Sequence, residues 1–427
     1  MVETTNAATP LAATEPVWDN IRWKPRFFAI WTGQAFSLIG SALTQFVLIW
    51  WITQTTQSAS ALATAGIMAL LPQAIFGPLG GTLADRWNRR LIMIVADSIT
   101  ALCMVILILL FATERVELWH LYTLMFVRST MQAFQSPASA ASTSMLVPPA
   151  WLPRAAGLNQ TIYGLMNVAA APLGAAALGV LPLQGALMID VVTALLGIVP
   201  LLFFRIPQPP RPDTTELTVW QDFRLGVRLV ASNRGLVMLY GVTVLMIGVL
   251  MPSFVLTPLL VLNEFGGGVN EVALMEGISG IGMVLGGILI SVLPLPRRRI
   301  LVVLIGYAVA CITIAFAGMT PGHLFWLAVF WWFISGATFS LGNAPVMAIL
   351  QTIVPHHMQG RALSLFSTLM GIAGPAGLVL AGPLGEILGV RGMLISCGVV
   401  ATLVCLAGFL SPSLMQIEEQ KLKDIPL

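Results

Sequence analysis

Long apolar runs recur along almost the whole chain, and they restrict its fold more than any other feature. Each run is bounded by charges or by Pro/Gly clusters and is long enough to cross a bilayer, which takes about 20 residues. The twelve runs lie at residues 27–52, 60–83, 91–112, 119–142, 154–181, 185–205, 234–262, 269–293, 299–319, 323–351, 357–388 and 392–411. Because a helix satisfies its own backbone in lipid, the pattern predicts an all-α membrane protein with twelve transmembrane helices.

The composition agrees with a lipid environment. Of the 427 residues, 57% are hydrophobic and only 9% are charged, and the mean hydropathy is +0.89. Soluble domains carry about 25% charged residues. A water-soluble fold is therefore excluded, and the lipid bilayer is the expected surrounding. The formal net charge of +3 is too small to indicate a nucleic-acid partner.

The sequence lacks the residue patterns that disulfide bonding, metal binding and ATP hydrolysis require. The four cysteines all fall inside apolar runs, without CxxC spacing or neighbouring histidines, so neither a disulfide framework nor a metal site is expected. Lysine occurs only at Lys24, Lys421 and Lys423, which excludes a G-x-x-x-x-G-K-[ST] phosphate loop and hence ATP hydrolysis by this chain. We expect no cofactor, and a function other than that of an enzyme.

Arginine and lysine gather in alternate segments between the predicted helices. If the chain starts inside the cell, the inner segments hold 18 of the 21 basic residues. The outer loops hold Arg115 and Arg391, and Arg128 lies within a predicted helix. Because cytoplasmic loops carry an excess of Lys and Arg, both termini are expected in the cytoplasm and the chain is predicted to be a multi-pass protein of the cell membrane.

The polar segments divide the chain into two predicted bundles. Residues 1–26 are predicted to be a disordered cytoplasmic tail with a basic anchor. Residues 27–205 are predicted to form an N-terminal six-helix bundle. Residues 206–233, rich in proline and arginine, read as a cytoplasmic linker with a short interfacial helix. Residues 234–411 form the second six-helix bundle, and 412–427 a cytoplasmic tail.

The two predicted bundles resemble each other at their fifth helices. Pro172 and Gly174 recur as Pro375 and Gly377 at an offset of 203, each pair preceded by a further glycine at the same spacing. Gly and Pro are common in membrane helices, so a chance match is the alternative. Together with the loop charges, the match predicts a parallel repeat of six plus six helices in which these residues serve helix packing.

A polar string separates the second and third predicted helices. Residues 81–90 read Gly-Thr-Leu-Ala-Asp-Arg-Trp-Asn-Arg-Arg. This string resembles the G-x-x-x-D-R-x-x-R-[RK] signature of the major facilitator superfamily and stands at that family's position. The resemblance implies a conformational latch made of Gly81, Asp85, Arg86, Arg89 and Arg90. In it the aspartate faces the start of the eleventh helix, and the arginines make ion pairs that help to hold the outward-open state.

Shorter stretches narrow the resemblance. They are Trp31–Ala35, Phe76–Pro78, Ala96–Asp97, Val127–Ser129 and Gly360–Ser364. They look like the macrolide-efflux branch of the drug:proton antiporters, related members of which export siderophores. The branch therefore does not fix the substrate.

Polar side chains share one face on two predicted helices. Gln34, Ser37, Ser41 and Gln45 do so on the first helix, and Arg128, Gln132, Gln135, Ser139 and Ser142 on the fourth. Lipid would not tolerate these faces, so we expect them to line a central cavity, although hydrogen bonding between helices would explain the serines equally well. Tyr163, Asn167, Trp331 and Ser335 on the fifth and tenth helices are further cavity candidates. For the aromatic residues, packing is the alternative.

Four ionisable residues lie inside predicted helices: Asp97, Arg128, Asp190 and Glu276. Arg128 lies roughly 13 Å from the nearer end of its helix, close to the middle of the hydrocarbon layer. The family resemblance implies a role for it in proton coupling. Among the acids we rank Glu276 first, because it begins a face of small residues; for each of the acids an interfacial structural role remains the alternative.

These observations favour a secondary active exporter of hydrophobic or amphiphilic compounds, driven by protons through alternating access. The expected partners are a small-molecule substrate, protons and lipid, and the chain is expected to be a monomer. A siderophore or metabolite exporter and an importer of the same fold are alternatives. A sensor or scaffold that does not transport is a more remote one.

Overall fold

The computed structural model describes residues 23–207, 219–293 and 298–419, and every regular element in these ranges is a helix. The predicted tails at residues 1–22 and 420–427, and residues 208–218 of the predicted linker, lie outside them.

Six long helices make up the first half of the chain. They are α1 (Trp23–Thr56), α2 (Ala59–Arg86), α3 (Arg89–Ala112), α4 (Leu118–Leu146), α5 (Leu152–Val180) and α6 (Leu183–Phe203). A short 3-10 turn, η1 (Pro149–Trp151), precedes α5. A serine and an asparagine, Ser58 and Asn88, cap α2 and α3 by accepting hydrogen bonds from their first turns.

The second half begins after a short helix in the predicted linker. That helix is α7 (Val219–Ala231), and it is followed by α8 (Arg234–Val255), α9 (Thr257–Phe265), α10 (Val269–Val292), α11 (Arg299–Met319), α12 (Phe325–Ile353), α13 (Gln359–Phe409) and α14 (Pro412–Met415). Two 3-10 turns, η2 (His356–Met358) and η3 (Ile417–Glu419), flank α13 and α14.

The predicted boundaries are wrong in one place and agree with the structure in another. The apolar run 234–262 is broken after Val255, and Pro258, which cannot donate a backbone hydrogen bond, stands in the first turn of the separate helix α9. The runs 357–388 and 392–411 correspond to the two helical parts of α13, which spans 51 residues and is kinked between them at Gly389, where φ is +69°. Glycine is the residue that adopts such an angle without strain.

Ten of the described helices are long and apolar enough to cross a membrane. The helix α4, which matches the predicted run 119–142, is not among the ten, because its polar face lowers its hydropathy. The all-helical membrane fold is confirmed.

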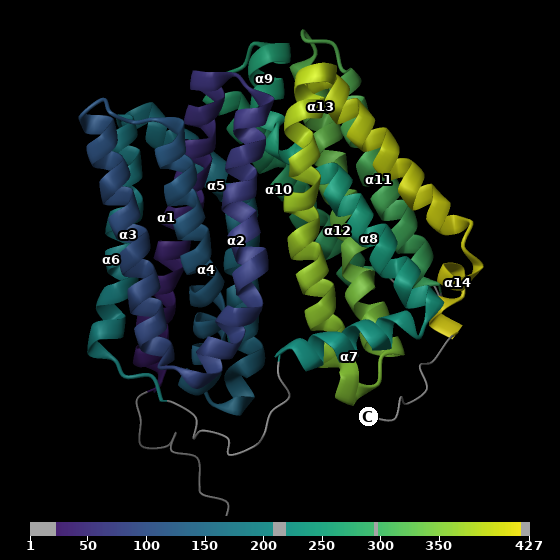
Figure 1. The fold of residues 1–427 in the computed structure, drawn as a ribbon, viewed down its shortest axis with the longest axis horizontal. Coiled ribbons are helices and arrows are strands. Elements are labelled where there is room, and N and C mark those ends of the chain that lie inside the picture. The colour runs from purple at the N-terminus through teal and green to yellow at the C-terminus, as the bar shows by residue number, and fades with distance from the viewer. Residues whose placement is uncertain (1–22, 208–218, 294–297, 420–427) are drawn as a thin grey trace, which may run out of the picture.

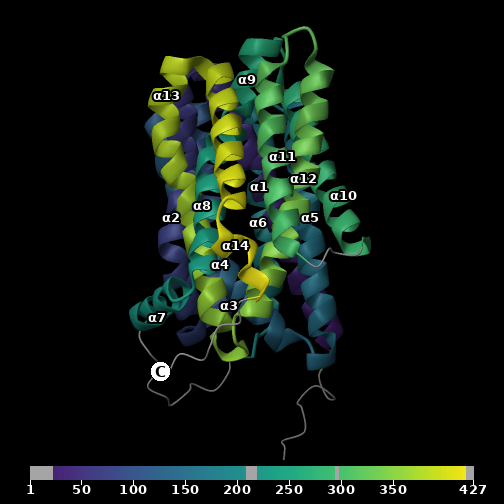
Figure 2. The ribbon, with the colours of Figure 1, turned by 90° about the vertical axis from the view of Figure 1, so that its right-hand side faces the viewer.

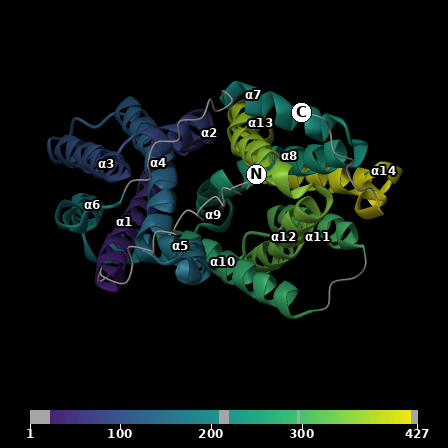
Figure 3. The same ribbon diagram turned by 90° about the horizontal axis from the view of Figure 1, so that it is seen from below.

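The helices form two bundles that stand side by side (Figures 1 and 3). One holds α1–α6 and the other α8–α14; they meet mainly where α2 packs on α13 and where α5 packs on α10. Arg86, Arg89, Arg154, Arg234 and Arg361 all lie at helix termini on one end of the molecule, here called the basic end. In the side view, α9 lies at the opposite end from α7 and α14 (Figure 2).

Matched glycines let matched helices approach closely. A Cβ on Gly174 of α5 would lie 2.5 Å from the ring of Phe46 of α1, and one on Gly377 of α13 would lie 1.8 Å from the carbonyl oxygen of Gly248 of α8. Only a residue without a Cβ permits such backbone contact. The fifth helix thus packs on the first within one half as α13 packs on α8 within the other, which is the relation that a parallel repeat requires.

Replacing Gly377 by alanine should destabilise the second bundle, because the added methyl group meets the backbone of α8. Such overpacking costs about 1–3 kcal/mol. Gly241→Ala on α8 is the matched control, since a Cβ there meets nothing within 4 Å. Thermal unfolding in detergent should show a lower midpoint for Gly377→Ala only; equal midpoints for the two variants would contradict the close approach.

Candidate functional site

A pocket of about 560 Å³ lies at mid-depth between the two halves. Its walls come from α1–α5 in the first half and from α8, α9 and α10 in the second. Most of the lining is apolar. The polar members are Ser41, Gln45, Gln73, Thr100, Arg128, Ser129, Gln132 and Glu276. An apolar chamber with few polar groups is typical of a small-molecule site.

The gap between the halves is open at one end. A second pocket of about 930 Å³ shares Leu70 and Gln73 with the first and runs between α2 and α13 toward the basic end. At the opposite end α2 and α13 are in contact. There Ser60 Oγ donates to Glu386 Oε1 at 2.6 Å, and a Cβ on Gly385 would lie 2.8 Å from Ala59. The central pocket is therefore reached from the basic end.

A buried ion pair stands at the wall of the central pocket. Arg128 Nη2 lies 2.8 Å from Asp190 Oδ2, so the pair joins α4 directly to α6. The two residues are 8% and 0% exposed. A charge at this depth is expensive unless it is paired, and the pairing explains how the first half tolerates both residues.

Hydroxyl groups of α1 complete the surroundings of Asp190. Ser41 Oγ donates to Oδ1 at 2.9 Å, and Thr44 Oγ1 lies 3.1 Å from Oδ2 while accepting from Arg128. Gly40 allows this arrangement, because a Cβ there would lie 1.9 Å from Thr193 Oγ1 and would push α6 away. The carboxylate is thus bonded on both oxygens.

The guanidinium of Arg128 is bonded on one side only. Its Nε and Nη1 are buried and have no hydrogen-bond partner among the described residues. Buried donors without acceptors cost about 1–3 kcal/mol each. Arg128 therefore has unused donors beside the cavity that it lines, which a ligand or water could satisfy.

Glu276 lines the same pocket from the other half of the molecule. It is half-buried on α10, and it makes no hydrogen bond or ion pair with the part of the chain that the structure describes. The small residues after it pack as the sequence suggested. A Cβ on Gly280 would lie 2.3 Å from the carbonyl oxygen of Asn167 on α5, and Gly336 of α12 lies against Ser279.

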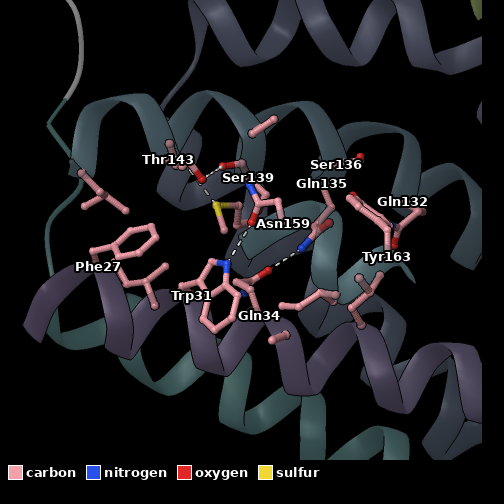
Figure 4. Close-up of a pocket in the computed structure, with 18 residues that line it drawn as sticks. Phe27, Trp31, Gln34, Gln132, Gln135, Ser136, Ser139, Thr143, Asn159 and Tyr163 are labelled. Atoms are coloured by element: carbon pink, nitrogen blue, oxygen red, sulfur yellow. Dashed lines mark hydrogen bonds between the residues drawn. The ribbon is translucent and has the colours of Figure 1, made fainter. Parts of the chain in front are cut away.

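A second polar cluster lies inside the first half. Asp97 of α3 is 6% exposed and accepts a hydrogen bond from Gln34 Nε2 at 2.9 Å. Gln135 of α4 in turn donates to Gln34 Oε1 at 2.5 Å. These two glutamines border a pocket of about 130 Å³ enclosed by α1, α3, α4 and α5, in which Trp31 Nε1 donates to Asn159 Oδ1 (Figure 4).

The structure divides the predicted cavity residues into three groups. Ser41, Gln45, Arg128, Gln132 and Glu276 line the central pocket. Gln34, Ser37, Gln135, Ser139, Ser142 and Tyr163 line the smaller pockets within the first half, at which Asp97 also lies.

The remaining candidates line none of the pockets described here. Ser335 Oγ donates to the carbonyl oxygen of Ala310, and Trp331 packs on Phe316, because this face of α12 is turned to α11. Asn167 lies on an exposed face of α5 and borders none of the pockets described above.

Several residues of this site were missed from the sequence, among them Thr44, which bonds to Asp190, and the lining residues Gln73, Thr100 and Ser129. Thr44 stands three residues after Ser41 and continues its polar face, a signal that could have been found. Gln73 is a single amide in an apolar helix and was equally visible. Thr100 gives no such signal, since helical threonines bond to their own backbone as often as they face a cavity.

The residues of the latch motif lie at the mouth of the open gap. Gly81 and Asp85 border it from α2, opposite Gly360 and Arg361 of α13. Asp85 is exposed, and its nearest basic partner is Arg89 at 3.5 Å.

The arginines of the motif bind carbonyl groups in this conformation. Arg89 donates to the carbonyl oxygens of Ala84 and Ala141, and Arg90 to those of Leu201 and Leu202 at the end of α6. Arg86 is exposed at the end of α2. Arg89 and Arg90 thereby fasten the start of α3 to the ends of α4 and α6.

Comparison with known proteins decides the family. The sequence model of the Major Facilitator Superfamily matches residues 30–378 and 238–423. The chain belongs to this superfamily. It is 30% identical to Macrolide efflux protein A of Streptococcus pyogenes over 94% of this chain and 98% of that protein. It is 24% identical to Multidrug efflux pump Tap of Mycolicibacterium fortuitum over 89% and 94% of the two chains.

Solved structures agree on the fold of this superfamily member. A bacterial homologue of the human lysosomal transporter Spinster, in an inward-facing and unoccupied conformation, matches with a TM-score of 0.67 at 16% identity, over 94% of this chain and 100% of that one. The predictions of a major facilitator fold, and of a transporter similar to macrolide efflux proteins rather than an enzyme, are confirmed.

Breaking the ion pair from one side should cost more than removing both charges. Arg128→Met leaves the Asp190 carboxylate buried without a counter-charge, a loss of about 3–5 kcal/mol. The double variant Arg128→Met, Asp190→Asn should be less destabilised than the sum of the two single variants, as thermal unfolding in detergent would measure. Arg115→Met, at an exposed position, is the control and should change the free energy of unfolding by less than about 0.5 kcal/mol. Strict additivity would contradict the pair.

Proposed function

We propose that this protein exports hydrophobic and amphiphilic compounds of the macrolide type across the cell membrane, driven by protons that flow inward. The two halves rock about the central pocket, so that it opens to one side of the membrane at a time. The basic end faces the cytoplasm, and the shape described above is the inward-open state. The bundles are residues 27–205 and 234–411, joined by a cytoplasmic linker.

The proposed topology has twelve crossings with both termini in the cytoplasm. Ten helices qualify by hydropathy, α4 is added because its polar face is turned into the protein, and α13 supplies two crossings because it bends at Gly389. The basic end then coincides with the cytoplasmic side, as the excess of arginine there favours.

The observation that carries the proposal is the position of Arg128, with Asp190 behind it, on a largely apolar pocket that also holds the unpaired Glu276. A large apolar compound gains affinity by leaving water for such a pocket. Its arrival removes water from the carboxylates and changes how readily they hold protons. Substrate and proton can therefore compete without sharing a contact. The macrolide and multidrug efflux names of the relatives support export over import.

Gradient-driven transport should depend on the two carboxylates. In vesicles that carry the purified protein, Glu276→Gln and Asp190→Asn should each lower proton-driven accumulation of erythromycin by more than about tenfold, because the carried proton loses its site. Glu271→Gln at the start of the same helix is the control, since glutamine preserves its capping contact. Full proton-coupled transport in both variants would overturn the coupling assignment. A parallel panel of dyes and siderophores, with and without a protonophore, tests the substrate class.

The contacts at the two ends of the gap should bias the state of the transporter in opposite directions. Ser60→Ala loosens the closed end and should favour the outward-open state, while Asp85→Asn weakens the proposed latch and should favour the inward-open state. Labelling of Ser364→Cys by a membrane-impermeant thiol reagent from the basic side should fall and rise accordingly, by roughly two- to fivefold for exposed contacts worth up to about 1 kcal/mol. Thr82→Val is the control. Shifts in the same direction for both variants would contradict the latch.

A further inference from the structure

The first bundle contains a row of three neighbouring pockets. They are the central pocket, a small pocket of about 20 Å³ and the pocket of about 130 Å³ shown in Figure 4. Leu38 and Gln132 line all three, and Gln135 lines the last two. The row leads from the middle of the molecule into the first half and away from the gap between the halves.

The small pocket connects the two buried carboxylates of the first half. Ser41 donates to Asp190 Oδ1 at 2.9 Å and lines this pocket together with Asp97. A space of about one probe sphere, 10–15 Å³, holds a water molecule when polar groups surround it. At about 20 Å³, with Ser37, Ser41, Asp97 and Gln135 on its wall, the pocket meets both conditions.

Asp97 differs from Asp190 in its surroundings. The ionisable group that acts on it is Asp190 from α6, while α1 supplies the neutral Gln34 and Ser37. Arg128 is already bonded to Asp190. Among the described residues Asp97 therefore has no basic partner in contact, and a buried carboxylate in that position is relieved of its charge by taking up a proton.

The pocket of about 130 Å³, here called the inner pocket, leads from the Gln34 amide beside Asp97 toward the basic end. Gln34 and Gln135 stand at its inner part, and the lining ends with Phe27, Thr143 and Leu146, which belong to the first turns of α1 and the last turns of α4 (Figure 4). Serine, threonine and amide groups form about half of its lining, and apolar side chains form the rest. Amides do not carry protons readily, so the two glutamines would orient water and fix the Asp97 carboxyl group.

We propose that Asp97 is a proton relay that connects Asp190 to the cytoplasmic solution through the first bundle. The proton leaves the Asp190 carboxyl group through the Ser41 hydroxyl and a water molecule and binds the Asp97 carboxylate, while Asp190 regains its ion pair with Arg128. Asp97 then releases the proton to water in the inner pocket. This inference rests on the proposed proton-driven export, and it adds that protons and drug leave the centre by different routes.

The relay predicts a separation of two activities in the variant Asp97→Asn. Exchange of labelled for unlabelled erythromycin across vesicles at equal pH needs no net proton movement, and it should stay within about twofold of the unchanged protein. Uphill transport driven by a pH gradient should fall by more than about tenfold. Asp97→Glu should restore part of it. Gln135→Leu, which removes the hydrogen bond to Gln34 and does not border the central pocket, should show the same split.

The relay and the proposed function would fail in different ways. Normal uphill transport in Asp97→Asn, or an equal loss of exchange and uphill transport in both variants, overturns the relay. Failure of the unchanged protein to accumulate drug in a pH gradient overturns the proposed function instead. The two failures are therefore distinguishable.

The separate route can be probed without measuring transport. The variant Ser139→Cys, in the inner pocket, should react with an impermeant thiol reagent from the basic side whether or not erythromycin saturates the protein. Cysteine at Ser364, in the gap between the halves, should be protected by erythromycin. The four native cysteines are buried, and the unchanged protein gives the background. Protection of both positions, or no reaction at Ser139→Cys, would exclude a separate aqueous route.

Discussion

The ion pair between Arg128 and Asp190 is the constraint on which the arrangement of the first bundle depends. Neither charge could stand alone at this depth, and their contact requires α4 and α6 to approach the same segment of α1. That approach in turn requires Gly40, where no side chain would fit. The most polar part of the molecule is thus also one of its most tightly packed parts, and the donors of Arg128 that remain unused lie beside the pocket.

The contacts between the two halves are of a different kind. Glycine and alanine line the closed end of α2 and α13, and the side-chain hydrogen bond from Ser60 to Glu386 joins the halves there. Smooth backbone contacts of this sort have little directional preference, so they can separate and re-form at low cost. Rigid bundles with polar cores and a weakly bonded seam between them suit a rocking motion better than a continuous core would.

Much of this could be predicted from the sequence, and the failures share one physical cause. Hydropathy and arginine placement predicted the helices and their orientation, since they reflect each segment's own contact with lipid, and the string at residues 81–90 indicated the family. Pairing depends on which helices become neighbours, so the bond between Arg128 and Asp190 was not predicted. Ser335 was assigned to the cavity because a polar residue in a membrane helix must face protein, and facing α11 satisfies that rule equally well. The break after Val255 was missed because the predicted run 234–262 is largely apolar on both sides of it.

The separation of polar and apolar spaces bears on how a drug and a proton can be coupled. If both occupied one chamber, a large apolar compound would block the exit of the proton that it displaces. In this protein the carboxylates of the first bundle lie behind α1, with polar pockets of their own, while the drug-sized volume faces the second half. Arg128 borders the drug-sized pocket and is bonded to Asp190 behind it, so it is the group through which filling of the chamber would reach the proton sites. Coupling would then require only that the drug alter the hydration of the Arg128 guanidinium. Drugs of different chemical structure could do this equally well, so the coupling would tolerate a range of substrates.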